Sequence, residues 1–225
     1  MRWLAFALAL VAAPLPARAC ALELILALDV SGSVDRDEFA LQVGGLADAF
    51  EDPAVAEAVE GLEGGMIATV TYWSGASRQH HATGWHRVSD AAGLARFAGA
   101  IRAAPRPWRN FSTAIGQALI HARQVSDTAP ADCKRRVIDV SGDGVSNEGR
   151  PPAMISGRLE RAGYTINGLV IRGAEPDPVE HYELDVIAGP GAFVEIAADF
   201  SDYPRAIRRK LLREISPPMI VSDAQ

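Results

Sequence analysis

Short apolar runs alternate with amphipathic stretches along almost the whole chain, and this alternation limits the possible folds more than any other feature of the sequence. Each run has the length of a strand, and each amphipathic stretch places its apolar residues at helical spacing. Strands that alternate with helices predict a mostly parallel sheet covered on both faces. We expect strands over residues 22–29, 66–73, 79–88, 136–140, 164–171 and 192–196, and helices over 35–50, 89–103, 113–125, 177–187 and 202–215, with a further helix starting at Pro151.

The predicted architecture is α/β and doubly wound, with six strands. Residues 79–88 form the weakest of the strand-like runs, and we expect them to pair antiparallel at an edge of the sheet. Asp35 and Glu38, at the start of the first expected helix, have the spacing of a capping box. No internal repeat or linker is evident, so 225 residues fit one domain over 20–215, followed by a flexible tail over 216–225.

The first nineteen residues have the pattern of an export signal. Arg2 precedes an apolar stretch over 3–13, and Ala17 and Ala19 satisfy the small-x-small cleavage rule. The stretch is too short to span a bilayer, and no later segment reaches that length. We therefore predict a signal peptide over 1–19, no transmembrane segment, and a bacterial protein that is exported to the periplasm or secreted.

The charge balance narrows the possible partners. The whole chain has a net charge of −6, and removal of Arg2 and Arg18 leaves 20 basic against 28 acidic side chains, or −8. An acidic protein is a poor candidate for binding nucleic acid, so we expect no nucleic-acid partner. The basic residues gathered over 205–213 alternate with apolar ones and indicate the solvated face of a terminal helix.

Cys20 and Cys133 are the two cysteines of the chain. They lie nine residues before Asp29 and ten before Asp143. If these aspartates end adjacent parallel strands, the cysteines lie at the opposite ends of the same strands. Because exported proteins meet an oxidising compartment, we predict a Cys20–Cys133 disulfide. Free thiols are one alternative, and a lipidated Cys20 is another, although Arg18 fits a lipobox poorly.

Oxygen-bearing side chains follow two of the expected strands. Asp29-Val30-Ser31-Gly32-Ser33 closes the first strand, and Asp143 follows the strand over 136–140. Ligands of doubly wound sheets bind at the carboxyl ends of strands, where the strand order reverses. The helix that begins at Thr113 can place its first hydroxyl beside these ends. The candidate metal ligands are Asp29, Ser31, Ser33, Thr113 and Asp143.

These ligand types favour a hard divalent cation, namely Mg²⁺ or else Mn²⁺ or Ca²⁺. Three of the five candidate ligands are neutral hydroxyls, so the cation keeps part of its positive charge. Such an ion favours an incoming carboxylate at an open coordination position. We therefore expect a protein partner that offers an acidic side chain.

At these residues the sequence resembles the von Willebrand factor A family. The metal-ion-dependent adhesion site of that family has Asp-x-Ser-x-Ser, a distant Thr and a distant Asp, and all five ligand types match here. The resemblance covers about residues 22–215. The segments 73–75, 137–144 and 166–169 look closer still to an exported bacterial branch, a domain of unknown function. The resemblance implies a metal-dependent, adhesion-type binding module of the bacterial envelope, not an enzyme, and it leaves the partner unidentified.

Two other functions stay open. Asp29 and Asp143 can cap helices without binding an ion, in which case the protein is a structural or scaffold component of the envelope. A Mg²⁺-dependent, phosphatase-like hydrolase also uses a strand-end aspartate, but it needs a second acid two residues later, where Ser31 stands. The sequence contains neither a Gly-x-Ser-x-Gly elbow nor a Walker loop. We therefore expect no enzymatic activity.

Histidine, tryptophan and arginine residues raise further hypotheses. His80 and His86 share a face of the expected edge strand, where a soft-metal site is conceivable, but exposed polar residues explain them more simply. The loop with Trp108 leads to the helix that carries the candidate threonine, and Trp108 can line the face around the metal. Arg106 or Arg109 can help to hold an acidic partner, or they lie in a solvated loop.

Overall fold

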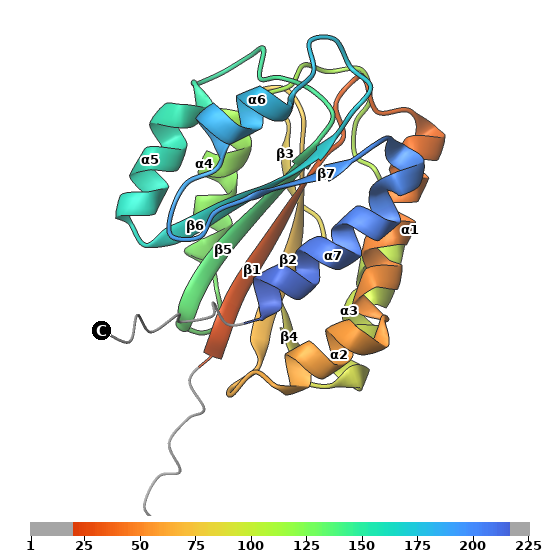
Figure 1. The fold of residues 1–225 in the computed structure, drawn as a ribbon, viewed down its shortest axis with the longest axis vertical. Helices are drawn as coiled ribbons and strands as arrows, with labels where there is room; N and C mark the ends of the chain where they lie inside the picture. Colours follow the sequence, from red (N-terminus) through yellow and green to blue (C-terminus); the bar gives the residue numbers. More distant parts are fainter. Residues whose placement is uncertain (1–19, 217–225) are drawn as a thin grey trace, which may run out of the picture.

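The computed structural model describes residues 20–216, which form one seven-stranded sheet between two layers of helices (Figure 1). The strands are β1 (Cys20–Asp29), β2 (Met66–Trp73), β3 (Gln79–His81), β4 (His86–Val88), β5 (Cys133–Gly142), β6 (Tyr164–Ile171) and β7 (Val194–Ala197). They lie in the order β3-β2-β1-β5-β6-β7, and β4 also pairs with β2. All pairs except those of β3 and β4 are parallel. The predicted doubly wound α/β class is confirmed.

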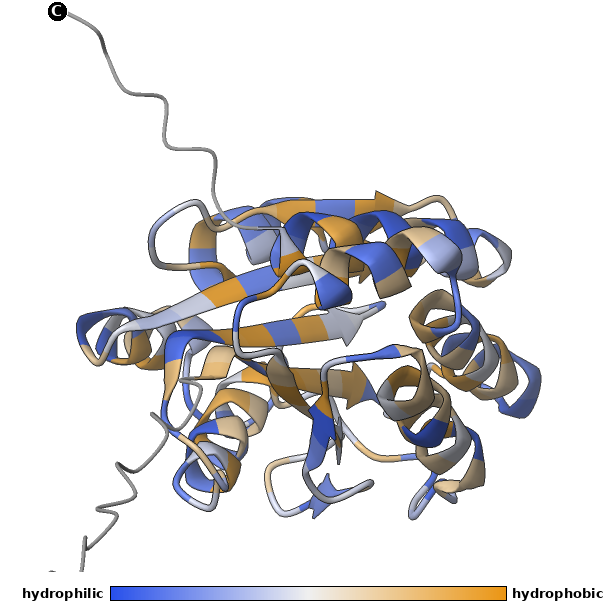
Figure 2. Cartoon of the chain, turned by 90° about the horizontal axis from the view of Figure 1, so that it is seen from below, coloured by the Kyte–Doolittle hydropathy of each residue, from blue (hydrophilic) through white to orange (hydrophobic). Residues whose placement is uncertain are grey.

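Helices cover both faces of the sheet. On one face lie α1 (Arg36–Phe50), α2 (Pro53–Glu60), α3 (Ala91–Ala103) and α7 (Tyr203–Ile215), and on the other lie α4 (Ile115–Ser126), α5 (Pro152–Arg161) and the short α6 (Val179–His181). Successive residues of β1 alternate between the two cores, since Leu24 packs in the first and Ile25 in the second. A strand buried on both faces is almost continuously apolar, and in β1 the buried Glu23 interrupts the run. Figure 2 shows the resulting apolar strands inside the molecule, with polar stripes on the helices.

The start of α1 follows the predicted capping box. The carboxylate of Asp35 accepts hydrogen bonds from the backbone N–H groups of Asp37 and Glu38, and the Glu38 carboxylate accepts one from the N–H of Asp35. These bonds satisfy groups at the first turn that have no partner within the helix. The helix therefore begins directly after the turn that carries Asp29, and its position is defined by local sequence.

Residues 79–88 pair antiparallel with β2 at the sheet edge, but as two strands separated by a bulge. Val70 of β2 accepts a hydrogen bond from the N–H of Ala82 at 2.8 Å, while its own N–H donates to the Thr83 hydroxyl at 3.0 Å. Gly84 takes a positive φ of 67°, which glycine adopts without steric strain. The bulge divides the expected strand and raises the strand number from six to seven.

The helix expected over 177–187 is divided as well. It consists of α6 and a π-helical turn (Tyr182–Val186), closed by a hydrogen bond of 3.0 Å from the N–H of Ile187 to the carbonyl of Tyr182. The turn places the Tyr182 side chain inside the core beside α4 and α5. This position brings an aromatic hydroxyl next to the carboxyl ends of the strands.

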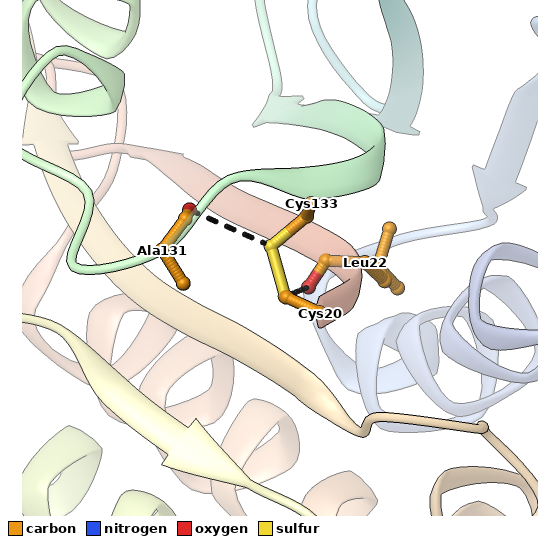
Figure 3. The surroundings of a disulfide bond; sticks show 4 residues. All are labelled: Cys20, Leu22, Ala131 and Cys133. Carbon is orange, nitrogen blue, oxygen red and sulfur yellow. Dashed lines mark hydrogen bonds between the residues drawn. A yellow bond between two sulfur atoms is a disulfide. The ribbon is translucent and has the colours of Figure 1, made fainter. Parts of the chain in front are cut away.

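The register of β1 against β5 pairs Cys20 with Cys133, and the two form a disulfide with their Cα atoms 4.3 Å apart (Figure 3). The predicted disulfide is confirmed, and neither thiol is free. The same register places the end of β1 beside the end of β5, so that Asp29, the last residue of β1, and Asp143, the first residue after β5, lie at the ends of neighbouring strands.

The predicted signal peptide over 1–19 lies outside the described residues, as do residues 217–225 of the tail predicted over 216–225. Within residues 20–216, no helix has both the length and the apolar character that a membrane span requires.

Candidate metal centre

Three of the five candidate ligands lie at the end of β1 and in the turn that follows it. Asp29, the last residue of β1, is fully buried, and its Oδ1 accepts a hydrogen bond from the N–H of Ser31 at 2.7 Å. Its Oδ2 is also buried and has no hydrogen-bond partner within residues 20–216. A buried carboxylate oxygen is unfavourable without a partner. This oxygen is therefore suited to ligating a cation, directly or through water.

Two serine hydroxyls connect this turn to Asp143. Ser31 is buried and Ser33 is exposed, and their hydroxyl oxygens lie 3.2 Å apart. The Ser33 hydroxyl donates a hydrogen bond to Oδ1 of Asp143 at 2.8 Å. Asp143 follows the last residue of β5, which neighbours β1. The structure thus brings Asp29, Ser31, Ser33 and Asp143 into one cluster at the carboxyl ends of two strands.

Thr113 lies just before α4, beside the loop that follows Asp143. Its N–H donates to the Asn147 side-chain oxygen, and its carbonyl accepts from the N–H of Asn147, both at 2.9 Å. The Thr113 side chain is buried, and a methyl group built on Gly144 would lie 3.9 Å from its hydroxyl oxygen. Asn147 therefore holds the fifth candidate ligand in place. Sequence reasoning missed Asn147 because it is 34 residues from Thr113.

The carboxyl groups of Asp29 and Asp143 lie in an environment that disfavours their ionised forms. Burial, and after it repulsion from Asp143, raises the pKa of Asp29 to about 8. Burial also raises the pKa of Asp143. Opposite charge nearby would favour the ionised forms, yet no lysine or arginine forms an ion pair with either aspartate within residues 20–216. A divalent cation would provide that charge, and carboxylate and hydroxyl oxygens are the ligands that Mg²⁺ and Ca²⁺ prefer.

Arg106 holds the backbone of the turn over residues 30–35, which we call the metal turn. Its guanidinium donates hydrogen bonds of 2.7 to 3.0 Å to the carbonyl oxygens of Val30, Ser31, Val34 and Asp35. These bonds occupy both terminal nitrogens, so the contacts of Arg106 are with the turn, where sequence analysis expected either a partner contact or a solvated loop. Arg109 is exposed and forms no ion pair within the described part of the chain.

The aromatic residues Trp73 and Tyr182 pack on the buried side of the site, next to Asp29. Trp73 is fully buried, and its ring nitrogen donates to the carbonyl of Ala27 at 3.0 Å. A methyl group on Gly142 would lie 2.6 Å from the Tyr182 hydroxyl, 3.0 Å from Asp29 Oδ2 and 3.2 Å from the Trp73 ring. Residue 142 must therefore be glycine for these groups to approach one another. The glycine before Asp143 was the only sequence signal of this contact.

The histidines of the sheet edge bond to neighbouring residues. His81 Nε2 lies 2.7 Å from the Thr69 hydroxyl, and a ring nitrogen of His86 lies 3.1 Å from the Thr83 carbonyl. No three His, Cys, Asp or Glu side chains are grouped for metal binding anywhere in residues 20–216. Trp108 packs against the core, with its ring 6.0 Å from that of His80. The candidate centre contains two carboxylates and three hydroxyls. With two acidic residues it has fewer than the three His, Cys, Asp or Glu residues of such a group.

A family model described as "Protein of unknown function (DUF1194)" matches residues 19–219. Comparison with curated proteins finds no match. The fold is similar to three solved structures, and the chain spans less than half of each of them. Their low sequence identity means that the likeness shows the fold alone, which is that of a von Willebrand factor A domain.

The first of these structures is proximal thread matrix protein 1 from the mussel byssus, with a zinc-occupied MIDAS motif: the TM-score is 0.64 and the identity 18%, over 88% of this chain and 46% of that one. The second is the von Willebrand factor type A protein from Catenulispora acidiphila, with a TM-score of 0.59 and 20% identity over 88% and 43% of the two chains. The third is the pilus adhesin SpaC from Lactobacillus rhamnosus GG, with a TM-score of 0.63 and 12% identity over 88% and 31%.

Proposed function

The chain belongs to the DUF1194 family, and we propose that its von Willebrand A-type domain is a divalent-metal-dependent protein-binding module of the bacterial envelope. The ligands of the cation are Asp29, Ser31, Ser33, Thr113 and Asp143. The observation that carries this proposal is the buried Oδ2 of Asp29, which has no hydrogen-bond partner within residues 20–216 and lies in a cluster with a second carboxylate and two hydroxyls.

The chemistry of the ligands supports a binding function. Two carboxylates and neutral hydroxyls leave a bound Mg²⁺, Mn²⁺ or Ca²⁺ with positive charge, which attracts a further carboxylate. An acidic side chain of a partner protein can supply it. Similar structures include a protein with a zinc-occupied MIDAS motif and a pilus adhesin, which supports a metal-dependent contact between proteins here.

The two lysines of the chain argue against the phosphatase-like alternative. Such an enzyme needs a lysine near the phosphoryl group. Lys210 is fully buried and pairs with Asp139 and Glu214. Lys134 lies at the start of β5, at the other end of the strand from Asp143. Neither lysine lies where it can contact a group bound at the candidate centre.

The proposed location outside the cytoplasm rests on two features. The sequence of residues 1–19 has the pattern of a signal peptide, and the domain contains a disulfide between its first and fifth strands. Disulfides persist in the periplasm and outside the cell, and they are rare in the cytosol.

Calorimetric titration of the mature chain, residues 20–225, with Mg²⁺, Mn²⁺ and Ca²⁺ tests the metal site. We expect binding heat and a rise in melting temperature for at least one ion. The variants Asp29→Asn and Thr113→Ala should lose both signals while keeping the circular dichroism spectrum of the fold. Ser89→Ala, an exposed serine outside the site, is the matched control. Absence of heat and of any thermal shift in the parent protein would contradict the proposal.

A capture experiment tests the partner. The mature protein is immobilised and exposed to a periplasmic extract in Mg²⁺ and then in EDTA. We expect at least one protein to be retained only with Mg²⁺, and to be lost with Asp29→Asn. Identical retention by the parent protein in both buffers would show that binding is independent of the metal.

A further inference from the structure

A groove of about 480 Å³ lies between α1 and the segment that follows α3. We call it the arginine groove, because four arginines line it and no acidic residue does. Its lining includes Arg36, Phe39 and Gly44 from α1, and Arg102, Arg106 and Arg109 from the end of α3 and the next loop. Four cations in one groove are unexpected in a chain whose net charge is −6.

Three of the four arginines form no ion pair with an acid in the described part of the chain. Arg102 pairs with Asp48 and Glu51. Arg106 bonds to carbonyl oxygens, which carry no net charge. The exposed Arg36 and Arg109 form no ion pair within residues 20–216. The groove therefore presents excess positive charge.

The cations also lie close enough to repel one another. Arg106 and Arg109 lie three positions apart in one loop and both line the groove, while Asp35 and Glu38 lie near enough to Arg106 to offset part of its charge. A protein gains nothing in folding stability from two like charges held together. An anion placed between them would relieve this repulsion, so the groove is suited to a negatively charged ligand.

The floor of the groove is apolar and open. Phe39 is half-buried, and the Arg106 guanidinium stacks 5.5 Å from the centre of its ring. Val43 and Ala40 continue this floor along α1. A methyl group built on Gly44 would have no atom within 4 Å, so the groove has free space above that residue. An apolar side chain of a ligand can occupy this space.

Arg106 connects the groove with the metal turn. Arg106 lines the groove and donates to the carbonyl of Ser31, whose hydroxyl is a candidate ligand of the cation. A chain segment that offers a carboxylate to the metal can therefore continue into the groove without crossing the domain. A groove of this volume and mixed polarity is larger than an inorganic phosphate requires, and it fits several residues of a peptide.

We propose that the arginine groove binds an acidic peptide segment of the partner protein, with glutamates or aspartates facing Arg36 and Arg109 and an apolar side chain above Gly44. This proposal rests on the proposed metal-dependent function, because it describes the rest of the same partner's segment. It adds a contact that does not need the metal.

The variant Gly44→Trp tests this inference, since a Cβ at this position has no atom within 4 Å in the described part of the chain and a large side chain there extends into the groove. Gly99→Trp is the matched control, because Gly99 is exposed on α3, has equally open surroundings and lies outside the groove. The probe is a fluorescent ten-residue peptide of alternating glutamate and phenylalanine, with a glutamine-for-glutamate peptide as its uncharged counterpart. Circular dichroism verifies the fold of both variants.

In EDTA, we expect the acidic peptide to bind to the parent protein and to Gly99→Trp, and to bind at least tenfold more weakly to Gly44→Trp and to Arg109→Glu. The glutamine peptide should bind at least tenfold more weakly than the acidic one, and added salt should weaken binding. No binding of the acidic peptide, equal binding to Gly44→Trp and Gly99→Trp, or complete displacement by an equal concentration of inorganic phosphate would overturn the inference.

The metal dependence separates this inference from the proposed function. In EDTA, Asp29→Asn should bind the acidic peptide as well as the parent protein does. The parent protein should bind the acidic peptide more tightly in Mg²⁺ than in EDTA. Asp29→Asn should bind the peptide equally well in both buffers. Binding that is weakened by Gly44→Trp but unaffected by Mg²⁺ would support the groove and contradict the metal site. Binding that depends on Mg²⁺ but is unaffected by Gly44→Trp would support the metal site and contradict the groove.

Discussion

The hydroxyl of Ser33 donates a hydrogen bond of 2.8 Å to the carboxylate of Asp143, a residue 110 positions later in the chain. Ser33 belongs to the turn after β1, and Asp143 belongs to the turn after β5. These two strands are parallel neighbours in the sheet. The bond therefore links the two halves of the candidate metal centre. It also orients one oxygen of Asp143 toward the turn that carries Asp29.

Replacement of Ser33 by alanine removes this link and one candidate ligand. We expect the affinity for Mg²⁺ to fall about ten- to a hundredfold, as it does when groups that orient metal ligands are lost. Folding stability should fall by only about 0.5–1.5 kcal/mol, the net contribution of one hydrogen bond. Calorimetry and urea unfolding measure the two effects. An unchanged affinity for Mg²⁺ would remove Ser33 from the site.

Gly142 is required by packing beneath the site. Alanine at this position would place a methyl group 2.6 Å from the Tyr182 hydroxyl. We expect Gly142→Ala to destabilise the fold by about 1–3 kcal/mol, as overpacking of a core does. The double variant Gly142→Ala/Tyr182→Phe lacks the nearest clashing atom, so it should recover part of the loss in thermal unfolding. Gly99→Ala, in open space on α3, serves as the control. Destabilisation by Gly99→Ala equal to that of Gly142→Ala would mean that the steric explanation is wrong.

Lys210 lies between two buried carboxyl groups. Its amino nitrogen lies 2.8 Å from Asp139 Oδ1 and also pairs with Glu214. Burial raises the pKa of Asp139 to about 7 even beside this lysine. We expect Lys210→Met to lower the free energy of unfolding at pH 8 by about 3–5 kcal/mol, since it leaves buried charge without a counter-ion. Lys134→Met, at the exposed lysine, should change it by less than about 0.5 kcal/mol. Urea unfolding of both variants measures the difference, and similar values would contradict this account.

The disulfide closes a loop between residues 113 positions apart. In the chain-entropy model, a loop of this length stabilises the fold by about 4–5 kcal/mol. We expect dithiothreitol to lower the midpoint of urea unfolding of the parent protein. The double variant Cys20→Ser/Cys133→Ser should show the lowered midpoint in either buffer, which provides the control. If the reductant has the same effect on the double variant, the loss of stability does not come from this bond.

Local patterns predicted a large part of the fold. The strands Met66–Trp73 and Tyr164–Ile171 have the expected boundaries, because an apolar run between polar turns is itself the signal of a buried strand. The capping box at Asp35 was predictable for the same reason, since all of its bonds lie within four residues. The disulfide followed from the similar spacings, nine and ten residues, between the two cysteines and the aspartates at two strand ends.

Contacts between distant segments were not predictable in this way. Arg106 bonds to the metal turn 71 to 76 residues earlier in the chain, and the sequence offered only an arginine in a loop. The bulge over 82–85 depends on the pairing of β3 and β4 with β2, a strand from an earlier part of the chain. The helix over 53–60 was missed, although Asp52 before Pro53 is a regular helix start.

The sequence by itself determined the α/β class, the positions of most strands, the pair of cysteines and the five oxygen-bearing residues of the candidate centre, because each of these depends on residue type and spacing along the chain. Only the tertiary structure decided that Asp29 Oδ2 is buried without a hydrogen-bond partner among residues 20–216, that Arg106 holds the metal turn, and that an arginine-lined groove lies beside this turn. Burial and charge are properties of a site in three dimensions, so they depend on which distant segments pack together.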